Sequence, residues 1–132
     1  MTIVVDANVA IAVLNPDHLL HEVALVRCLS DGQPLILGIT RAEALIHPTR
    51  SGQFKGADAE LSRLGFITEA LDNDVADRAR QLRADYGNKS FPMVDAVVAA
   101  LGVNRGLTVV TCDAKWPAMA EVEVERLSPS SG

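Results

Sequence analysis

The chain has 132 residues, with 12 lysines and arginines against 17 aspartates and glutamates, and a formal net charge of −5. This length predicts one domain, and a hydrophobic content of 48% excludes intrinsic disorder. The acidic balance argues against nonspecific binding to duplex DNA, which needs clustered positive charge. It does not exclude a nuclease, because bound metal ions can supply positive charge locally.

The sequence carries no sign of secretion or of membrane insertion. Its first residues lack the basic segment that opens a signal peptide, and no apolar run approaches the roughly 18 residues of a membrane span. The two cysteines, Cys28 and Cys112, lie far apart, and we expect both to be thiols in a reducing compartment. We therefore expect a cytoplasmic protein with no membrane contact.

Short apolar strands alternate with helices through the first half of the chain. In order, we expect a strand over residues 3–5, a helix over 9–14, a helix over 18–29 capped by Asp17, and a strand over 35–37. A helix that starts at Thr40 should end before Pro48, and a weaker helix should follow over 51–64.

The same alternation continues through the second half. In order, we expect a strand over 66–68, an amphipathic helix from an Asp74 cap to Tyr86, a helix over 92–104, a strand over 107–111 and a half-exposed edge strand over 122–127. This pattern predicts an α/β fold with a mostly parallel sheet. We expect one domain over residues 1–127 and a flexible tail over residues 128–132.

Four acidic residues stand out by their apolar surroundings. Asp6 and Asp113 follow predicted strands, and ligands of parallel sheets bind beyond the carboxyl ends of the strands. If those two strands are neighbours, the two carboxylates face one crevice. Glu43 and Asp95 lie on predicted helices, and Asp95 has apolar neighbours on both sides, where an unpaired carboxylate is costly to bury.

Three of these acids also have a ready structural explanation, whereas Asp95 could be a cap only if its helix started later than expected. Asp6 is a favoured helix cap, Asp113 suits a turn, and Thr40 with Glu43 matches a capping box, which is the better explanation of Glu43 taken alone. Taken together, the acids point to chemistry. Oxygen ligands without histidine or cysteine are typical of Mg²⁺ or Mn²⁺ sites, and without a cation the carboxylates would repel one another.

Four segments resemble the successive motifs of the PIN-domain family, and are most like those of the VapC-type toxins of bacterial toxin–antitoxin pairs. They are residues 3–8 with Asp6, residues 40–43 with Glu43, residues 95–100 with Asp95, and residues 111–116 with Asp113 and a following aromatic residue. The likeness covers nearly the whole chain. It implies a three-layer sandwich in which helices flank a parallel sheet of about five strands.

The resemblance also implies a site and an activity. The activity is Mg²⁺- or Mn²⁺-dependent endoribonuclease cleavage, with Asp6, Glu43, Asp95 and Asp113 as the catalytic and metal-binding acids. Asn8 and Thr111 would support them, and Arg41 and Lys115 are the candidate RNA contacts. Lys115 stands where many relatives carry an acid or an amide, which leaves open whether the site holds one metal ion or two.

The partners implied are a VapB-type antitoxin, a structured RNA such as a tRNA or rRNA loop, a second copy of the chain in a homodimer, and DNA only through the antitoxin. The alternative is a PIN-fold module that binds RNA or protein with weak or no catalysis. A receiver-like signalling domain fits less well because no acid pair precedes Asp6. A phosphatase of the haloacid dehalogenase type would need a second acid where Asn8 stands.

Overall fold

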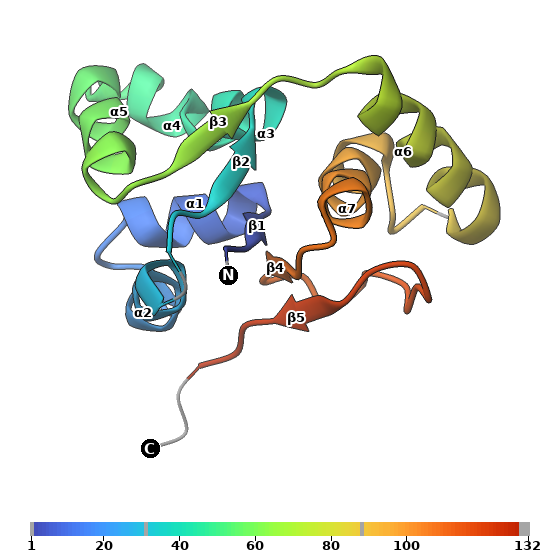
Figure 1. Cartoon of the computed structure of the whole chain (residues 1–132). Helices are drawn as coiled ribbons and strands as arrows, with labels where there is room; N and C mark the ends of the chain where they lie inside the picture. The colour runs from blue at the N-terminus through green and yellow to red at the C-terminus, as the bar shows by residue number, and fades with distance from the viewer. Residues whose placement is uncertain (1, 31, 88, 130–132) are drawn as a thin grey trace.

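The computed structural model describes residues 2–30, 32–87 and 89–129 (Figure 1). Residues 130–132 of the predicted tail lie outside the described residues. The strands and helices have the following bounds: β1 Val4–Val5, α1 Ala7–Leu14, α2 His21–Ser30, β2 Leu35–Leu37, α3 Gly38–Ala44, α4 Ile46–Arg50, α5 Phe54–Arg63, β3 Ile67–Glu69, α6 Asn73–Tyr86, α7 Met93–Arg105, β4 Val109–Thr111 and β5 Val124–Arg126.

The described strands form one five-stranded parallel sheet in the order β3-β2-β1-β4-β5. In the centre, Val4 of β1 pairs with Leu35 on one side and Val109 on the other. The condition stated for the sequence, that the first strand and the strand before Asp113 are neighbours, is therefore met. Because both strands run in the same direction, Asp6 and Thr111 lie at the same edge of the sheet.

Helices cover both faces of the sheet, which confirms the predicted three-layer sandwich (Figure 1). Alternate residues of a strand point to opposite faces. Val4 and Val109 pack in the same core as residues of α6 and α7, whereas Val5 and Val110 pack with residues of α1 and α2. The β-branched residues of the central strands are thus buried on both sides, as is typical of parallel sheets.

The predicted start of the third helix is wrong. The helix begins at Gly38, directly after β2, and its N-cap is Leu37 without a side-chain hydrogen bond. Thr40 is therefore an interior, buried residue of α3, and the capping box with Glu43 does not form. Pro48 does not end this helix either, because α3 already stops at Ala44 and Pro48 lies in the first turn of α4, where its missing N–H breaks no helical bond.

Two predicted caps are also wrong. The Asn15 Oδ1 atom accepts the N–H of Asp17, and His18 Nδ1 lies 3.0 Å from the Leu20 nitrogen, so turns occupy the expected first turn and α2 begins at His21. On α6 the cap is Asp72, whose Oδ1 accepts the N–H of Val75 at 2.8 Å, and Asp74 lies inside the first turn instead.

The packing of α7 on the sheet depends on a glycine. A Cβ atom on Gly102 would overlap the Val109 side chain and lie 3.0 Å from Cγ2 of Val122. This close approach brings the buried face of α7 onto β4, and Asp95 lies in the first turn of the same helix. The position of Asp95 therefore depends on how tightly α7 is seated.

Cys28 is buried and Cys112 is half-buried, and both are free thiols. Among the described residues, no helix is long and apolar enough to cross a membrane.

Candidate active site

Asp6 lies where the chain leaves β1 and enters α1. Its N–H donates to the carbonyl oxygen of Val110 at 3.0 Å, which ties this point of the chain to β4. Its side chain is only 6% exposed. Oδ1 accepts the N–H of Ala7 at 2.8 Å, and Oδ2 accepts the hydroxyl of Thr111 at 2.9 Å. Asp6 is therefore both the cap of α1 and a buried carboxylate at the sheet edge.

Asn8 and Thr111 connect the end of β1 to the end of β4. The Asn8 Nδ2 group donates to Oδ2 of Asp6 and to Oγ1 of Thr111, both at 3.3 Å, while its Oδ1 accepts the N–H of Cys112 at 3.0 Å. The Thr111 hydroxyl oxygen also accepts the N–H of Asp113 at 3.1 Å. These bonds fix the orientation of the Asp6 carboxylate and the course of the chain toward Asp113.

The other three acids come from separate elements. Asp113 is half-exposed after β4, and its Oδ1 accepts the N–H of Lys115 at 2.8 Å, so the turn anticipated from the sequence is present. Asp95 is half-buried in the first turn of α7. Glu43 is exposed on α3.

The pKa of Asp95 shows that the four acids share one electrostatic environment. This pKa is raised to about 7, most of all by burial and in addition by the negative charges of Asp6, Asp113 and Glu43. An interaction with the Trp116 side chain lowers it in part. A carboxylate surrounded by like charges in a half-buried place is held close to neutrality by its neighbours.

The pKa of Asp6 is displaced in the same direction. Burial raises it most, and the charges of Glu43 and Asp113 add to the increase. The hydrogen bonds from Thr111 and from the Ala7 N–H lower it, because they stabilise the ionised form. No lysine or arginine is among the principal causes of this displaced pKa.

A divalent metal ion fits the chemistry of this cluster. All four side chains offer oxygen ligands, which Mg²⁺ and Mn²⁺ prefer, and a cation would relieve the repulsion that raises the pKa of Asp95. The ion pairs among the described residues join other acids, such as Asp58 and Glu125. Within that same part of the chain, however, no three acid, histidine or cysteine side chains lie close enough together to form a complete metal site.

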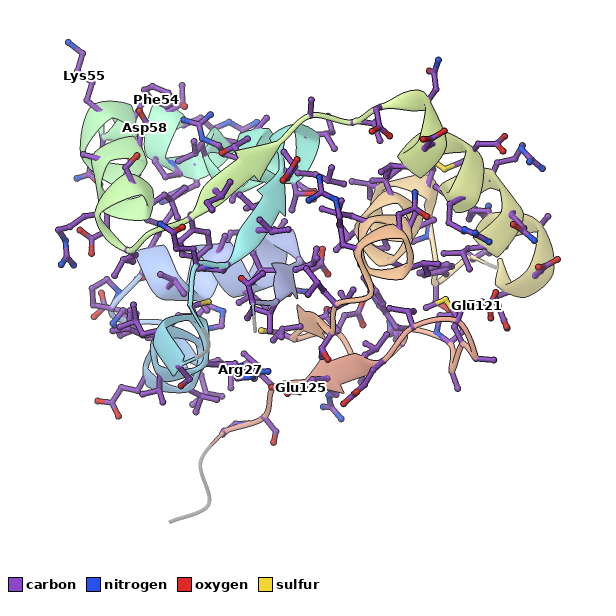
Figure 2. All side chains as sticks on the ribbon, in the orientation of Figure 1. Arg27, Phe54, Lys55, Asp58, Glu121 and Glu125 are labelled. Carbon is purple, nitrogen blue, oxygen red and sulfur yellow. The ribbon has the colours of Figure 1, made fainter. Side chains whose placement is uncertain are left out.

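The two candidate RNA contacts differ in their surroundings. Arg41 forms an ion pair with Asp58 of α5, and its guanidinium carbon lies 6.0 Å from the ring centre of Phe54. Figure 2 shows Phe54 and Asp58 on α5, so Arg41 is bound to that helix. Lys115 is exposed two residues after Asp113, whose carboxylate accepts its backbone N–H.

A mainly apolar groove borders the cluster. It has a volume of about 760 Å³ and runs between α1, α4 and α5. Its apolar wall includes Ile11, Leu14 and Ile46, and Glu43 lies in its lining. One side chain thus belongs both to the acid cluster and to a surface that is suited to an apolar partner.

Phe91 is a residue of this site that the sequence does not indicate, and in the sequence Trp116 is only an aromatic residue after the last motif. Phe91 is completely buried, and its ring meets that of Trp116 in a T-shaped contact with 5.5 Å between the centroids and 70° between the planes. The signal available in the sequence was an aromatic residue three positions after Asp113. Nothing in the local pattern shows that this ring reaches the start of α7.

Comparison with known proteins supports the fold. The family model of the PIN domain matches residues 3–122, whereas no curated protein sequence matches the chain. A toxin–antitoxin complex from Klebsiella pneumoniae contains a chain that is 23% identical, with a TM-score of 0.75 over 91% of this chain and 94% of that one. VapBC2 from Rickettsia felis, bound to a promoter DNA fragment, contains a chain that is 15% identical, with a TM-score of 0.73 over 96% of this chain and 98% of that one.

A third solved structure is VapC20 from Mycobacterium tuberculosis, described as a Sarcin-Ricin loop cleaving toxin. It is 19% identical, with a TM-score of 0.69 over 85% of this chain and 90% of that one. Identities this low establish a shared fold, and the family match covers most of the sequence. The chain therefore belongs to the PIN domain family and has the fold of VapC toxins.

Proposed function

We propose that the protein is a metal-dependent endoribonuclease and the toxin of a toxin–antitoxin pair. The observation that carries this proposal is the convergence of four acids at one sheet edge of a PIN domain, where burial and the charges of the other three raise the pKa of Asp95 to about 7. Surface acids with a structural role usually pair with lysines or arginines, whereas neither of these cations is among the groups that displace the pKa of Asp6 or of Asp95.

We assign the principal metal ligands, direct or through water, to Asp6, Asp95 and Asp113. A bound Mg²⁺ or Mn²⁺ would attract the phosphodiester and make a water molecule easier to deprotonate. The hydrogen bonds from Asn8 and Thr111 hold the Asp6 carboxylate in one orientation. They therefore prearrange a ligand before substrate binds.

The remaining acid, Glu43, is assigned as the base that orients the attacking water. It is exposed, and it acts on both Asp6 and Asp95 through its charge, so it lies at the open side of the cluster. A carboxylate in that position can accept a proton from water. Attack by water leaves a 5′-phosphate and a 3′-hydroxyl on the products.

The substrate we propose is a structured RNA with an exposed loop, such as a tRNA or rRNA loop. Aromatic residues make up only 4% of the chain, so few rings are available to stack along a single strand, whereas splayed loop bases can be read individually. One protein of this fold is described as a Sarcin-Ricin loop cleaving toxin. Lys115, exposed beside Asp113, is the better placed phosphate contact, because Arg41 is paired with Asp58.

The partner we propose is a VapB-type antitoxin that occupies the apolar groove and blocks the site beside Glu43. The groove is mainly apolar and borders the acid cluster, so a peptide with apolar and basic side chains would suit both parts. Solved proteins of this fold include a toxin–antitoxin complex and a VapBC complex bound to DNA. We further propose a homodimer, and contact with DNA only through the antitoxin.

A matched pair of substitutions tests the catalytic assignment. Asp6→Asn keeps the size of the side chain and its ability to cap α1, but it removes the charge. We expect RNA cleavage and growth inhibition to fall to background, with the melting temperature maintained. Asp85→Asn removes the same charge from an exposed position on α6, and we expect it to cleave and inhibit as the parent does.

The alternative is a module that acts by binding RNA or protein. In that case the Asp6→Asn protein would inhibit growth as strongly as the parent while cleaving nothing. That result would assign the toxicity to binding and would overturn the proposed catalytic role of Asp6.

A further inference from the structure

The chain contains a single tryptophan, and that residue lies beside the acid cluster. The Trp116 ring is held by its T-shaped contact with Phe91, which directly precedes the Pro92 cap of α7. Because Phe91 is completely buried and closely packed, its partner ring has little freedom to turn. The indole is thus fixed at the first turn of α7, the turn that carries Asp95.

The polar atom of this ring needs an acceptor. The Nε1 atom of Trp116 is buried, and among the described residues it has no hydrogen bond of ordinary geometry. A buried N–H without a partner costs about 1–3 kcal/mol, and buried tryptophans usually find one. Asp95, in the adjoining first turn of α7, is the candidate acceptor, because Trp116 lowers the pKa of its carboxyl group as a hydrogen-bond donor does.

We propose that Trp116 is a positioning residue, whose indole N–H donates a hydrogen bond to one oxygen of the Asp95 carboxylate and leaves the other oxygen directed at Asp6 and Asp113. The contact itself is supported by the packing of Trp116 on Phe91 and by its N–H, which is buried and unpaired among the residues that the structure describes. Its consequence for metal binding rests on the function proposed above. Removing a group that hydrogen-bonds to a metal ligand, without contacting the metal itself, typically lowers metal affinity by about 10- to 100-fold.

Three substitutions separate the hydrogen bond from the packing. Trp116→Phe keeps an aromatic ring against Phe91 but removes the N–H. Asp95→Ala removes the acceptor and leaves Trp116 in place, while Asp95→Asn keeps an oxygen acceptor without the charge. Glu43→Gln is the matched control, because it removes one charge from the same cluster without removing the proposed acceptor.

The single indole gives a direct readout in the metal-free protein. A ¹H–¹⁵N spectrum contains one indole N–H signal from Trp116, with no ambiguity of assignment. We expect this signal to lie downfield of a water-exposed indole, to move upfield in Asp95→Ala, to move less in Asp95→Asn and to stay in place in Glu43→Gln. A signal that does not respond to Asp95→Ala, in a protein that is still folded, would overturn the contact.

Calorimetric titration with Mn²⁺ alone tests the positioning role. We expect Trp116→Phe to bind Mn²⁺ about 10-fold more weakly than the parent, with an unchanged melting temperature in the absence of metal. Equal affinity of the two proteins would contradict positioning. A parent protein that binds no Mn²⁺ would instead contradict the proposed function, and the indole signal would still decide whether Trp116 contacts Asp95.

Discussion

At the scale of single residues, the site depends on carboxylates that destabilise one another. Asp95 is the clearest case, because burial and three like charges raise its pKa to about 7. Its importance could be predicted from the apolar residues on both sides of it. The ion pair of Arg41 with Asp58 could not, because the two residues are 17 positions apart on different helices and no local pattern joins them.

The raised pKa of Asp95 predicts a pH dependence of stability in the metal-free protein. The ordinary pKa is 3.8, so between that value and about 7 the folded protein binds a proton that the unfolded chain releases. The resulting stabilisation is complete below the ordinary pKa and is lost as the pH rises through about 7. Urea denaturation in EDTA at about pH 5 and about pH 8 should therefore show lower stability at the higher pH.

Asp95→Asn provides the control for this pH effect. The substitution removes the titrating group, so we expect the loss of stability between the two pH values to be smaller than in the parent, with the rest arising from groups such as Asp6. An identical pH dependence in the two proteins would contradict the assignment of the raised pKa to Asp95.

At the scale of elements, the alternation of strands and helices was predictable, and the points where they join were not. Thr40 and Glu43 have the spacing of a capping box, yet β2 runs directly into α3 and places Thr40 inside the helix. Asp72 and Asp74 are both acceptable caps in sequence, and only the path of the preceding loop selects Asp72. Such junctions are decided by tertiary packing rather than by local preference.

Gly102 gives a prediction about the packing of α7. Alanine is the better helix former, but its Cβ would overlap Val109. We expect Gly102→Ala to destabilise the protein by about 1–3 kcal/mol through overpacking, as measured by urea denaturation.

Gly56→Ala is the matched control for Gly102→Ala. A Cβ at Gly56 on α5 meets no atom within 4 Å, so we expect this substitution to stabilise the protein by about 0.5–1 kcal/mol. If Gly102→Ala were also stabilising, that result would contradict the close packing of α7 against Val109 of β4.

At the scale of the whole molecule, the fold brings four of the 17 acidic residues together in one place. The net charge of −5 argues against broad electrostatic binding to nucleic acid. The parallel arrangement of β1 and β4 gathers Asp6 and Asp113 at one edge of the sheet. The helices α3 and α7 bring Glu43 and Asp95 close enough for the four charges to affect one another. The sequence could predict this gathering only on the condition that the two strands were neighbours, which the sheet order confirms.

The central claim is that this edge of the sheet hydrolyses RNA with water and a divalent ion. The most direct measurement is the analysis of product ends after incubation of the protein with a structured RNA, in Mg²⁺ or Mn²⁺ and in EDTA. We expect cleavage only with the metal, and products that carry a 5′-phosphate and a 3′-hydroxyl. Cleavage that persists in EDTA and leaves a 2′,3′-cyclic phosphate would contradict the claim, because it would show attack by the ribose hydroxyl rather than by water.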